Sequence, residues 1–368
     1  MRILYYSKEE SNYMWQWQRF HIFDDLAHHN CTFDLLDSAC FSTWDQANEK
    51  LLEALKKNHY DLVMTPYGEG HIYISTLKEI KKIGVPSLLF CPDNNTIPFY
   101  YKNVSNYFDL VWLTGADTEY LFKSWGANTI FMPYAANPFI VNPIFGDEIE
   151  KVCFIGTPHG TRPKILNTLL DGDIDLCLYT KIAKKTKQIT NNGNPNGITK
   201  LKGASPIDYL KFHVGRKVIL GNIVNKLFFN NSLKIDSPSL EIREPLPFDK
   251  LYQAYSKYAL SISSVTARNT SVLKNPVYII NLRSFEIPMY GGLQICHYCH
   301  ELSEYFEEDK EIIFYRSEKE LIEKAKFYLR PENHSLRLSI KKTARYRAEN
   351  EHTWHHRFEK IFIELNIK

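Results

Sequence analysis

The sequence predicts an α/β protein with two domains, each built around a doubly wound parallel sheet. Short apolar runs that suit buried strands alternate with segments of helical periodicity along most of the 368 residues. This alternation stops at residues 133–150, which contain three prolines and few periodic apolar residues, and it resumes at Val152. A chain of this length can bury two cores. We therefore predict a first domain over residues 1–145 and a second over residues 146–349.

The first domain is expected to alternate strands with helices. We expect strands within residues 2–6, 31–36, 61–65, 85–90, 109–114 and 126–133, and helices over 14–26, 43–58 and 116–124. The dinucleotide fingerprint Gly-x-Gly-x-x-Gly is absent, so no dinucleotide is expected here. Because the order predicts a parallel sheet, ligands are expected outside the carboxyl ends of its strands.

The second domain repeats this alternation. Strands are expected at 152–156, 175–179, 258–263, 293–296 and 312–315, and helices from Pro163 and over 246–257, 301–311, 318–329, 334–349 and 352–365. Residues 181–205 are rich in Lys, Asn and Gly and predict a surface insertion, while residues 206–240 receive no assignment. The lysine run 181–187 predicts a solvated charged face, with contact to acidic lipid or a phosphorylated acceptor as the alternative.

Composition limits the class of protein. The formal net charge of +3 is too small to indicate nucleic-acid binding, but it leaves open an anionic ligand or weak contact with an anionic membrane surface. No run of 18 apolar residues occurs, and the first residues predict a strand, not a signal peptide. Seven cysteines at irregular positions are typical of reduced thiols, so a cytoplasmic location is expected.

Three polar residues follow strands of the first domain. Glu69 and His71 come after the strand at 61–65, and Asp93 comes after the strand at 85–90. Their placement on one rim of the sheet would allow a carboxylate or a histidine to act as general base on a hydroxyl group. The alternative is that Asp93 caps a helix and that Glu69 and His71 are ordinary surface residues.

Two stretches of the second domain have the composition of an anion site. Residues 156–162 place Gly156, Gly160 and Arg162 between a strand and a helix, without the Gly-Lys-(Ser/Thr) ending of a P-loop. In residues 276–292, Ser284 is expected to be the N-cap of a short helix, with Arg283 beside it and Glu286 one turn in. The alternatives are a plain strand-to-helix turn and a capped core helix with an exposed acid.

Residues 296–300, Cys-His-Tyr-Cys-His, contain zinc-ligand types, but no second ligand pair at matching spacing accompanies them. We expect a loop after the strand here, with zinc as the alternative. His352, His355 and His356 are assigned to packing and capping of the last helix. No metal site is therefore predicted.

Residues 283–292, Arg-Ser-Phe-Glu-Ile-Pro-Met-Tyr-Gly-Gly, resemble the donor-site signature of CgeB-like (spore maturation protein type) glycosyltransferases. The His352-Thr-Trp-x-x-Arg start of the last helix is the other strong match to this family, and Pro133-Tyr-Ala-Ala-Asn-Pro138 resembles the stretch that precedes its second domain. The resemblance implies the GT-B fold, with two Rossmann-like domains facing across a cleft and the C-terminal helix 350–368 joined to the first domain. The first domain would then bind the acceptor and the second a nucleotide-diphospho-sugar.

The same resemblance implies roles for individual residues. Glu286 would bind the ribose, and Asp93 is the preferred candidate for the catalytic base, because the family often has an acidic residue at this strand end, although Pro-Asp-Asn departs from the family's Asp-Asp-Pro. The implied donor-binding residues are Gly156, Thr157, Arg162, Arg243, Arg283, Ser284, Phe285, Glu286, Gly291 and Gly292. No cofactor and no obligatory metal are expected, because fixed cations and amides would stabilise the leaving diphosphate.

The expected activity is transfer of a sugar, most simply from a UDP-sugar, to a hydroxyl of a glycan or lipid-linked glycan, as in surface polysaccharide biosynthesis. A catalytically silent nucleotide-sugar binder and a nucleotide-sugar 2-epimerase remain as alternatives on the same fold. The expected location is cytoplasmic, with attachment to the inner face of the membrane left open.

Overall fold

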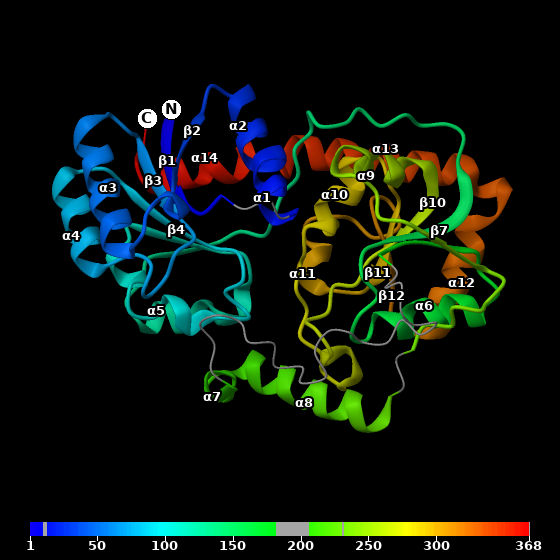
Figure 1. Ribbon diagram of the computed structural model, residues 1–368. Helices are drawn as coiled ribbons and strands as arrows, with labels where there is room; N and C mark the ends of the chain where they lie inside the picture. The colour runs from blue at the N-terminus through cyan, green and yellow to red at the C-terminus, as the bar shows by residue number, and fades with distance from the viewer. Residues whose placement is uncertain (10–12, 182–205, 230–231, 368) are drawn as a thin grey trace. The chain divides into compact units, whose positions relative to one another are not determined.

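The computed structural model of the chain describes residues 1–9, 13–181, 206–229 and 232–367. The chain divides into two compact units. Unit 1 comprises Met1–Asn137, Lys200–Gly215 and Thr353–Lys368, and unit 2 comprises Pro138–Thr199 and Arg216–His352. Each unit contains a sheet of six parallel strands flanked by helices (Figure 1), so the predicted α/β class with two doubly wound sheets is confirmed.

The strands of unit 1 lie in the order β2-β1-β3-β4-β5-β6, and all neighbours are parallel. Their bounds are β1 Arg2–Ser7, β2 Thr32–Asp37, β3 Leu62–Thr65, β4 Ser87–Cys91, β5 Leu110–Leu113 and β6 Thr129–Phe131. β3, β4 and β5 are buried along their whole length, which is why they are short apolar runs in the sequence. The order reverses between β1 and β3, so the loops after these strands diverge there.

The helices of unit 1 begin at recognisable caps. Thr43 Oγ1 accepts a hydrogen bond from Gln46 N at 3.2 Å at the start of α3, whose buried residues include Leu51 and Leu55, four positions apart. The α-helices are α1 Tyr13–Gln18, α2 Asp24–His28, α3 Trp44–Lys57, α4 Ile74–Ile83, α5 Glu119–Ser124, α7 Pro206–Leu210 and α14 Trp354–Glu364. Shorter turns are η1 Arg19–Phe23 (a π-helix), η2 Ser38–Cys40, η3 Pro98–Tyr101, η4 Ser105–Tyr107 and η5 Ala116–Thr118.

The C-terminal helix α14 is part of unit 1. Thr353 and His356 form a capping box at its start, because each side chain bonds the other residue's backbone N–H. The Trp354 ring lies 5.2 Å from Trp17 and 5.7 Å from Trp112, centroid to centroid, in the core of this unit. The last residues of the chain therefore complete the core that its first residues begin.

The sheet of unit 2 has the order β12-β11-β10-β7-β8-β9, again all parallel. The bounds are β7 Ile149–Ile155, β8 Leu176–Tyr179, β9 Leu240–Arg243, β10 Tyr258–Ile262, β11 Gln294–His297 and β12 Ile313–Tyr315. Its helices are α6 Arg162–Asp171, α8 His213–Phe228, α9 Phe248–Lys257, α10 Arg283–Met289, α11 His300–Ser303, α12 Glu318–Leu329 and α13 His334–Glu351, with turns η6 Thr270–Val272 and η7 Pro331–Asn333.

A buried charged group fastens α13 to the start of unit 2. Glu148 accepts a hydrogen bond from Arg337 Nε at 2.8 Å and forms an ion pair with Lys341. The three side chains are at most 2% exposed. Lys341 Nζ also donates to the Tyr258 carbonyl at 2.7 Å, which ties the group to β10. One buried carboxylate thus pairs with two buried cations, while Arg337 Nη2 has no hydrogen-bond partner among the described residues.

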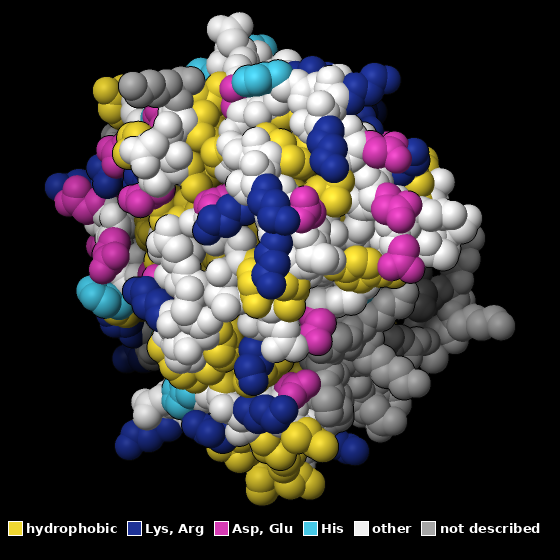
Figure 2. Space-filling model, turned by 90° about the vertical axis from the view of Figure 1, so that its left-hand side faces the viewer, with side chains coloured by type: hydrophobic (Ala, Val, Ile, Leu, Met, Phe, Trp, Pro, Cys, Tyr) yellow, Lys and Arg dark blue, Asp and Glu magenta, His cyan; other side chains and the backbone are white. Residues whose placement is uncertain are grey.

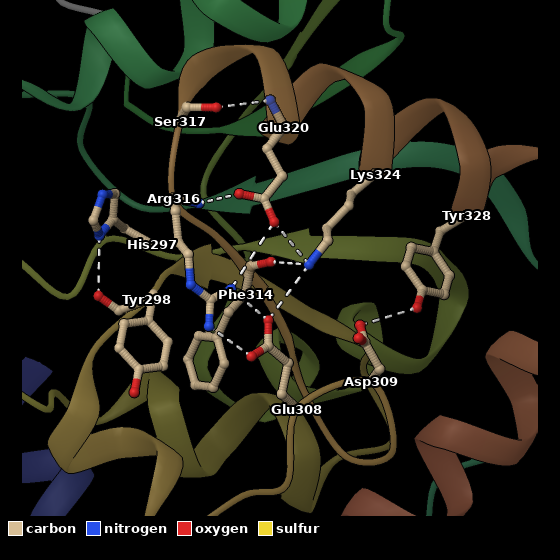
Figure 3. A network of polar contacts seen from close by, with 10 residues as sticks. All are labelled: His297, Tyr298, Glu308, Asp309, Phe314, Arg316, Ser317, Glu320, Lys324 and Tyr328. Atoms are coloured by element: carbon tan, nitrogen blue, oxygen red, sulfur yellow. Dashed lines mark hydrogen bonds and ion pairs between the residues drawn. The ribbon is translucent and has the colours of Figure 1, made fainter.

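A second, half-exposed network joins β12 to α12 (Figure 3). Arg316 makes two parallel hydrogen bonds to Glu308, at 2.7 and 2.8 Å. Lys324 Nζ lies 3.0 Å from Glu320 Oε1 and donates to the Phe314 carbonyl at 2.6 Å. Glu320 in turn accepts from the Arg316 backbone N–H at 2.7 Å. Arg316, Lys324, Glu308 and Glu320 thus each have an opposite charge as partner.

Several local predictions differ from the structure. The helix expected over 301–311 is wrong beyond its first turn, since only His300–Ser303 is helical. The helix expected over 14–26 is interrupted by the π-turn Arg19–Phe23. Within the unassigned stretch 206–240 the structure places α7, α8 and the edge strand β9. Most of the predicted insertion, residues 182–205, lies outside the described part of the chain. Within the described ranges, no helix is both long and apolar enough to cross a membrane.

Candidate functional site

The candidate site lies at the centre of the unit 2 sheet, where the strand order reverses. β7 and β10 are the central pair, and the connections after them run to opposite sides of the sheet. The loops that follow such a pair separate and leave a crevice at the carboxyl ends of the strands, which is the usual ligand site in sheets of this kind. The loop after β7 is residues 156–161, and the loop after β10 is residues 263–269.

The loop after β7 turns sharply at Gly156. Its φ of +140° lies in the region that glycine adopts without strain, and its N–H donates to the Tyr179 carbonyl on β8 at 3.0 Å. Helix α6 then begins at Arg162, whose Nη1 donates back to the Thr157 carbonyl at 3.0 Å. The guanidinium of Arg162 is thereby held against this loop.

Arg283 brings a second guanidinium to the same loop. Its Nε donates to the Ile155 carbonyl, the last of β7, at 3.0 Å. A Cβ at position 156 would lie 2.7 Å from Arg283 Nη2, so a side chain there would displace this guanidinium. The Arg283 N–H donates to Asn281 Oδ1 at 3.0 Å, which positions the start of α10.

The loop after β10 supplies a third arginine. Thr161 Oγ1 donates to the Arg268 carbonyl at 3.3 Å, which links the two loops. Arg268 has a φ of +44°, uncommon for a residue with a side chain. Beside it, Asn269 Oδ1 is buried without a hydrogen-bond partner among the described residues, and a Cβ at Gly160 would lie 2.4 Å from it.

The electrostatics of this cluster are those of a site for an anion. Burial and then the charge of Arg283 lower the pKa of Arg162 to about 10. Desolvation and then the charge of Arg162 lower the pKa of His159 to about 4, and Arg283 and Arg268 act in the same direction. In the described part of the chain, no carboxylate forms an ion pair with Arg162, Arg268 or Arg283. A phosphate group would supply the missing negative charge.

The residues predicted around Glu286 are placed differently from expectation. Ser284 is not the N-cap, because the helix begins at Arg283 with Leu282 in that position. Ser284 Oγ is buried and has no partner in the described part of the structure. Glu286 is only 2% exposed, so the alternative of an exposed acid is wrong. Phe285 is fully buried against Tyr305, Phe306 and His352, which is a packing role.

Close packing explains why positions 291 and 292 of the signature are glycine. Gly291 has a φ of +72°, and a Cβ there would lie 2.6 Å from Pro143. A Cβ at Gly292 would lie 2.8 Å from Ile287. Their N–H groups donate to the Pro288 and Ile287 carbonyls at 3.1 and 2.8 Å, which closes the end of α10. A direct role for either glycine in donor binding stays a prediction.

Arg243 ends the edge strand β9, two strands from β7. Its Nε donates to Glu241 Oε1 at 2.6 Å, and its Nη1 donates to the Tyr179 hydroxyl at 3.2 Å. Unlike the three arginines of the central loops, it has a carboxylate partner. Its predicted role in donor binding stays a prediction.

In unit 1, Glu69, His71 and Asp93 do follow β3 and β4, but they have different surroundings. His71 is held among aromatic rings, with Nδ1 3.0 Å from the Tyr100 hydroxyl and the Trp44 ring 4.4 Å away. The Asp93 carbonyl accepts from Thr96 N and Ile97 N, which forms a turn, and its side chain is exposed. Glu69 is also exposed.

Glu69 lines a cavity of about 740 Å³ in unit 1, together with aromatic and polar side chains. They include Tyr73, Ser75, Lys102, Asn106 and Trp125. His71 and Asp93 do not line this cavity. The structure therefore does not place the three predicted catalytic residues around one described cavity.

Two residues of the central cluster, Arg268 and Asn269, are missing from the sequence-based prediction. They follow β10 at its carboxyl end, a position that could have drawn attention to them. In the described ranges, no group of three His, Cys, Asp or Glu side chains could hold a metal ion. Cys296 and Cys299 are both buried.

Comparisons with known proteins agree with this architecture. Residues 213–362, less than half of the chain, match a family described as glycosyl transferase-like. No curated protein shows a significant sequence match. The fold is similar to that of a glycosyltransferase from Rickettsia africae, with a TM-score of 0.59, 10% identity and coverage of 100% of this chain and 98% of that chain.

Two further structures align over nearly the whole chain. Anabaena HepE in complex with UDP has a TM-score of 0.56 and 12% identity, with 100% of both chains covered. Sucrose-phosphate synthase from Thermosynechococcus elongatus has a TM-score of 0.54 and 12% identity, with 99% of this chain and 98% of that chain covered. The chain therefore has the two-domain GT-B fold, and its residues 213–362 are similar to a glycosyl transferase-like family.

Proposed function

We propose that this protein is a glycosyltransferase that uses a nucleotide-diphospho-sugar and binds its diphosphate in unit 2. The observation that carries the proposal is the group of Arg162, Arg268 and Arg283 at the reversal of the strand order, without ion-pair partners among the described residues. The family match includes Arg268 and Arg283. A UDP-sugar is the proposed donor, since HepE, which has a similar fold, binds UDP and UDP-glucose.

In this mechanism the arginines act on the leaving group. When the bond between the anomeric carbon and the diphosphate breaks, negative charge grows on the diphosphate oxygens. Guanidinium groups already fixed at that position stabilise this charge without reorganisation. Arg283 and Arg162 are fixed in advance, because each donates to a backbone carbonyl, of Ile155 and of Thr157. The same arrangement supports the proposal that no metal ion is obligatory.

Glu286 is the proposed ribose ligand, as the CgeB-like signature implies. Because its side chain is 2% exposed, the carboxylate must become accessible when the donor binds. In unit 1 we propose that the acceptor hydroxyl loses its proton to one of Asp93, His71 and Glu69. A surface glycan or a lipid-linked glycan is the proposed acceptor.

The test is binding of UDP, GDP, dTDP and CMP by calorimetry, to wild type, Arg283→Met and Arg162→Met. We expect one nucleoside diphosphate to bind the wild type and each variant to bind it about 10- to 100-fold more weakly, since a charge-assisted hydrogen bond contributes about 1.5–3 kcal/mol. Arg316→Met is the matched control, because it removes an arginine that is already paired with Glu308. Equal affinity in all four proteins would contradict the proposed diphosphate site.

Turnover distinguishes the proposed activity from its alternatives. A transferase releases nucleoside diphosphate in proportion to acceptor glycosylated, and it does so in the presence of EDTA if no metal is obligatory. Binding without turnover would identify a silent binder. Interconversion of the donor sugar without an acceptor would identify an epimerase.

A further inference from the structure

The helix α8, His213–Phe228, has an unusual distribution of polar and apolar side chains. Its inward side carries the buried apolar residues Val214 and Val218 together with small and polar residues. Asn222 Oδ1 accepts a hydrogen bond from Asn269 Nδ2 at 2.8 Å, and a Cβ at Gly221 would lie 2.7 Å from the Asn269 carbonyl oxygen. Asn225 is also buried. The helix therefore approaches the loop after β10 closely through Gly221 and Asn222.

The outward side of α8 is apolar. Leu220, Ile223 and Leu227 lie three and four positions apart, on one face of the helix, and they are 51%, 51% and 68% exposed. Phe228, at the end of the helix, is 74% exposed. A surface helix normally turns its apolar face inward and its polar face to water. α8 buries Val214 and Val218 on its inward side but exposes a second apolar face, which indicates that an apolar environment covers the outward face in the functional state.

The charge around this face is strongly positive. Residues 213–228 contain no Asp or Glu, whereas Arg216, Lys217 and Lys226 are cationic. Over residues 181–228 the sequence has ten Lys or Arg and one acid, Asp208. The other 320 residues have 35 Lys or Arg and 41 Asp or Glu, so the basic character of the chain is concentrated here. Figure 2 shows apolar side chains with Lys and Arg among them at the lower end, at the height of α7 and α8 in Figure 1.

We propose that the outward face of α8, defined by Leu220, Ile223, Leu227 and Phe228, lies in the surface of a bilayer that contains anionic lipid. Leucine and phenylalanine side chains would enter the boundary between headgroups and acyl chains, while Lys217 and Lys226 contact the headgroups. The proposal depends on α8 alone and not on the transferase activity.

The charge distribution argues for lipid and against a second copy of this chain. A symmetric contact through α8 would bring the cationic flanks of two copies together, without any acid on the helix to pair with them. The lysine-rich residues 181–187 carry the same sign, so their sequence offers no complementary cover. An anionic bilayer satisfies both the apolar face and the positive charge.

The test is co-sedimentation of the full chain with vesicles, either of phosphatidylcholine alone or with phosphatidylglycerol added. We expect binding to the mixed vesicles only, weakened by salt. The triple substitution Leu220→Gln, Ile223→Gln and Leu227→Gln is expected to lower partitioning about 100-fold, since three apolar side chains no longer enter the bilayer. The matched control changes Tyr120, Ile144 and Ile363 to Gln, three exposed apolar residues elsewhere, and is expected to bind like wild type.

A second pair of variants tests the charge without changing the apolar face. Lys217→Gln with Lys226→Gln is expected to lower binding to anionic vesicles about 20-fold, whereas Lys81→Gln with Lys257→Gln has little effect. Absence of wild-type binding to anionic vesicles, or equal binding by the triple variant, overturns the proposal. Concentration-dependent dimerisation in ultracentrifugation, abolished by the triple substitution and without vesicle binding, would assign the face to a second copy instead.

Discussion

Unit 2 contains two clusters of cationic side chains, and among the described residues only one of them pairs its cations with carboxylates. In the network of Figure 3, Arg316 and Lys324 are paired with Glu308 and Glu320, and the pairing joins β12 to α12. At the loops after β7 and β10, Arg162, Arg268 and Arg283 gather without ion-pair partners in the described part of the chain. Charges that are satisfied within the chain stabilise the fold. Like charges held together in advance reduce stability, and a ligand that neutralises them restores it.

The largest expected effect concerns the buried group of Glu148, Arg337 and Lys341. Glu148→Ala would leave two buried cations without their carboxylate and is expected to lower the free energy of unfolding by about 3–5 kcal/mol. Urea denaturation measures the change. Glu241→Ala is the control, because Glu241 pairs with Lys151 and Arg243 near the surface and should cost about 1 kcal/mol or less. Similar losses of stability in the two variants would mean that burial does not determine how much these ion pairs contribute to the free energy of unfolding.

Asp25 is a buried acid without a strong cationic partner among the described residues, and its titration gives the second prediction. The residue is fully buried, accepts a hydrogen bond from the His355 N–H at 3.1 Å, and has His29 Nε2 at 3.7 Å. Burial, opposed only in part by these backbone hydrogen bonds, raises the pKa of its carboxyl from 3.8 to about 7.

The sign of the pH dependence follows from this shift. Between about pH 4 and pH 7 the folded protein keeps a proton that the unfolded chain releases, so stability falls as pH rises through this window. The total change is about 2–4 kcal/mol. Asp25→Asn keeps an oxygen for the His355 N–H and removes the titration, so its stability profile should be flatter over the same window. Parallel profiles of the two proteins in thermal denaturation at several pH values would contradict the assignment.

The half-exposed network of Figure 3 is expected to contribute less. Glu308→Gln removes the partner that Arg316 holds at 2.7 and 2.8 Å, and it should lower stability by about 1 kcal/mol. The loss should shrink at high salt, because part of this network is accessible to solvent. A loss independent of salt would show that the carboxylate acts through packing.

Some elements of the fold and of the candidate site could be predicted from the sequence, and others could not. Buried parallel strands such as β4 and β10 are continuous apolar runs, so they are visible without a structure. The edge strand β9, Leu-Glu-Ile-Arg, carries charges that pair only in three dimensions, and α8 has apolar residues both on its buried side and on its exposed side. Neither has the pattern of an ordinary surface element. Arg283 and Arg162 were found because they adjoin a motif or a helix start, whereas Arg268 lies in a loop without one.

The smallest expected change in stability distinguishes the two clusters best, because substitutions in the two clusters are expected to change stability in opposite directions. Arg162→Met keeps the apolar stem and removes a guanidinium whose pKa is lowered to about 10 by burial and by Arg283. The ligand-free variant is therefore expected to be as stable as wild type or more stable, by up to about 1 kcal/mol. Arg316→Met, which breaks a satisfied pair, should be less stable than wild type. With a saturating nucleoside diphosphate the order of wild type and Arg162→Met should reverse, since binding stabilises only the protein that binds well. If Arg162→Met is destabilised as much as Arg316→Met without ligand, Arg162 serves the fold and the distinction between the two clusters fails.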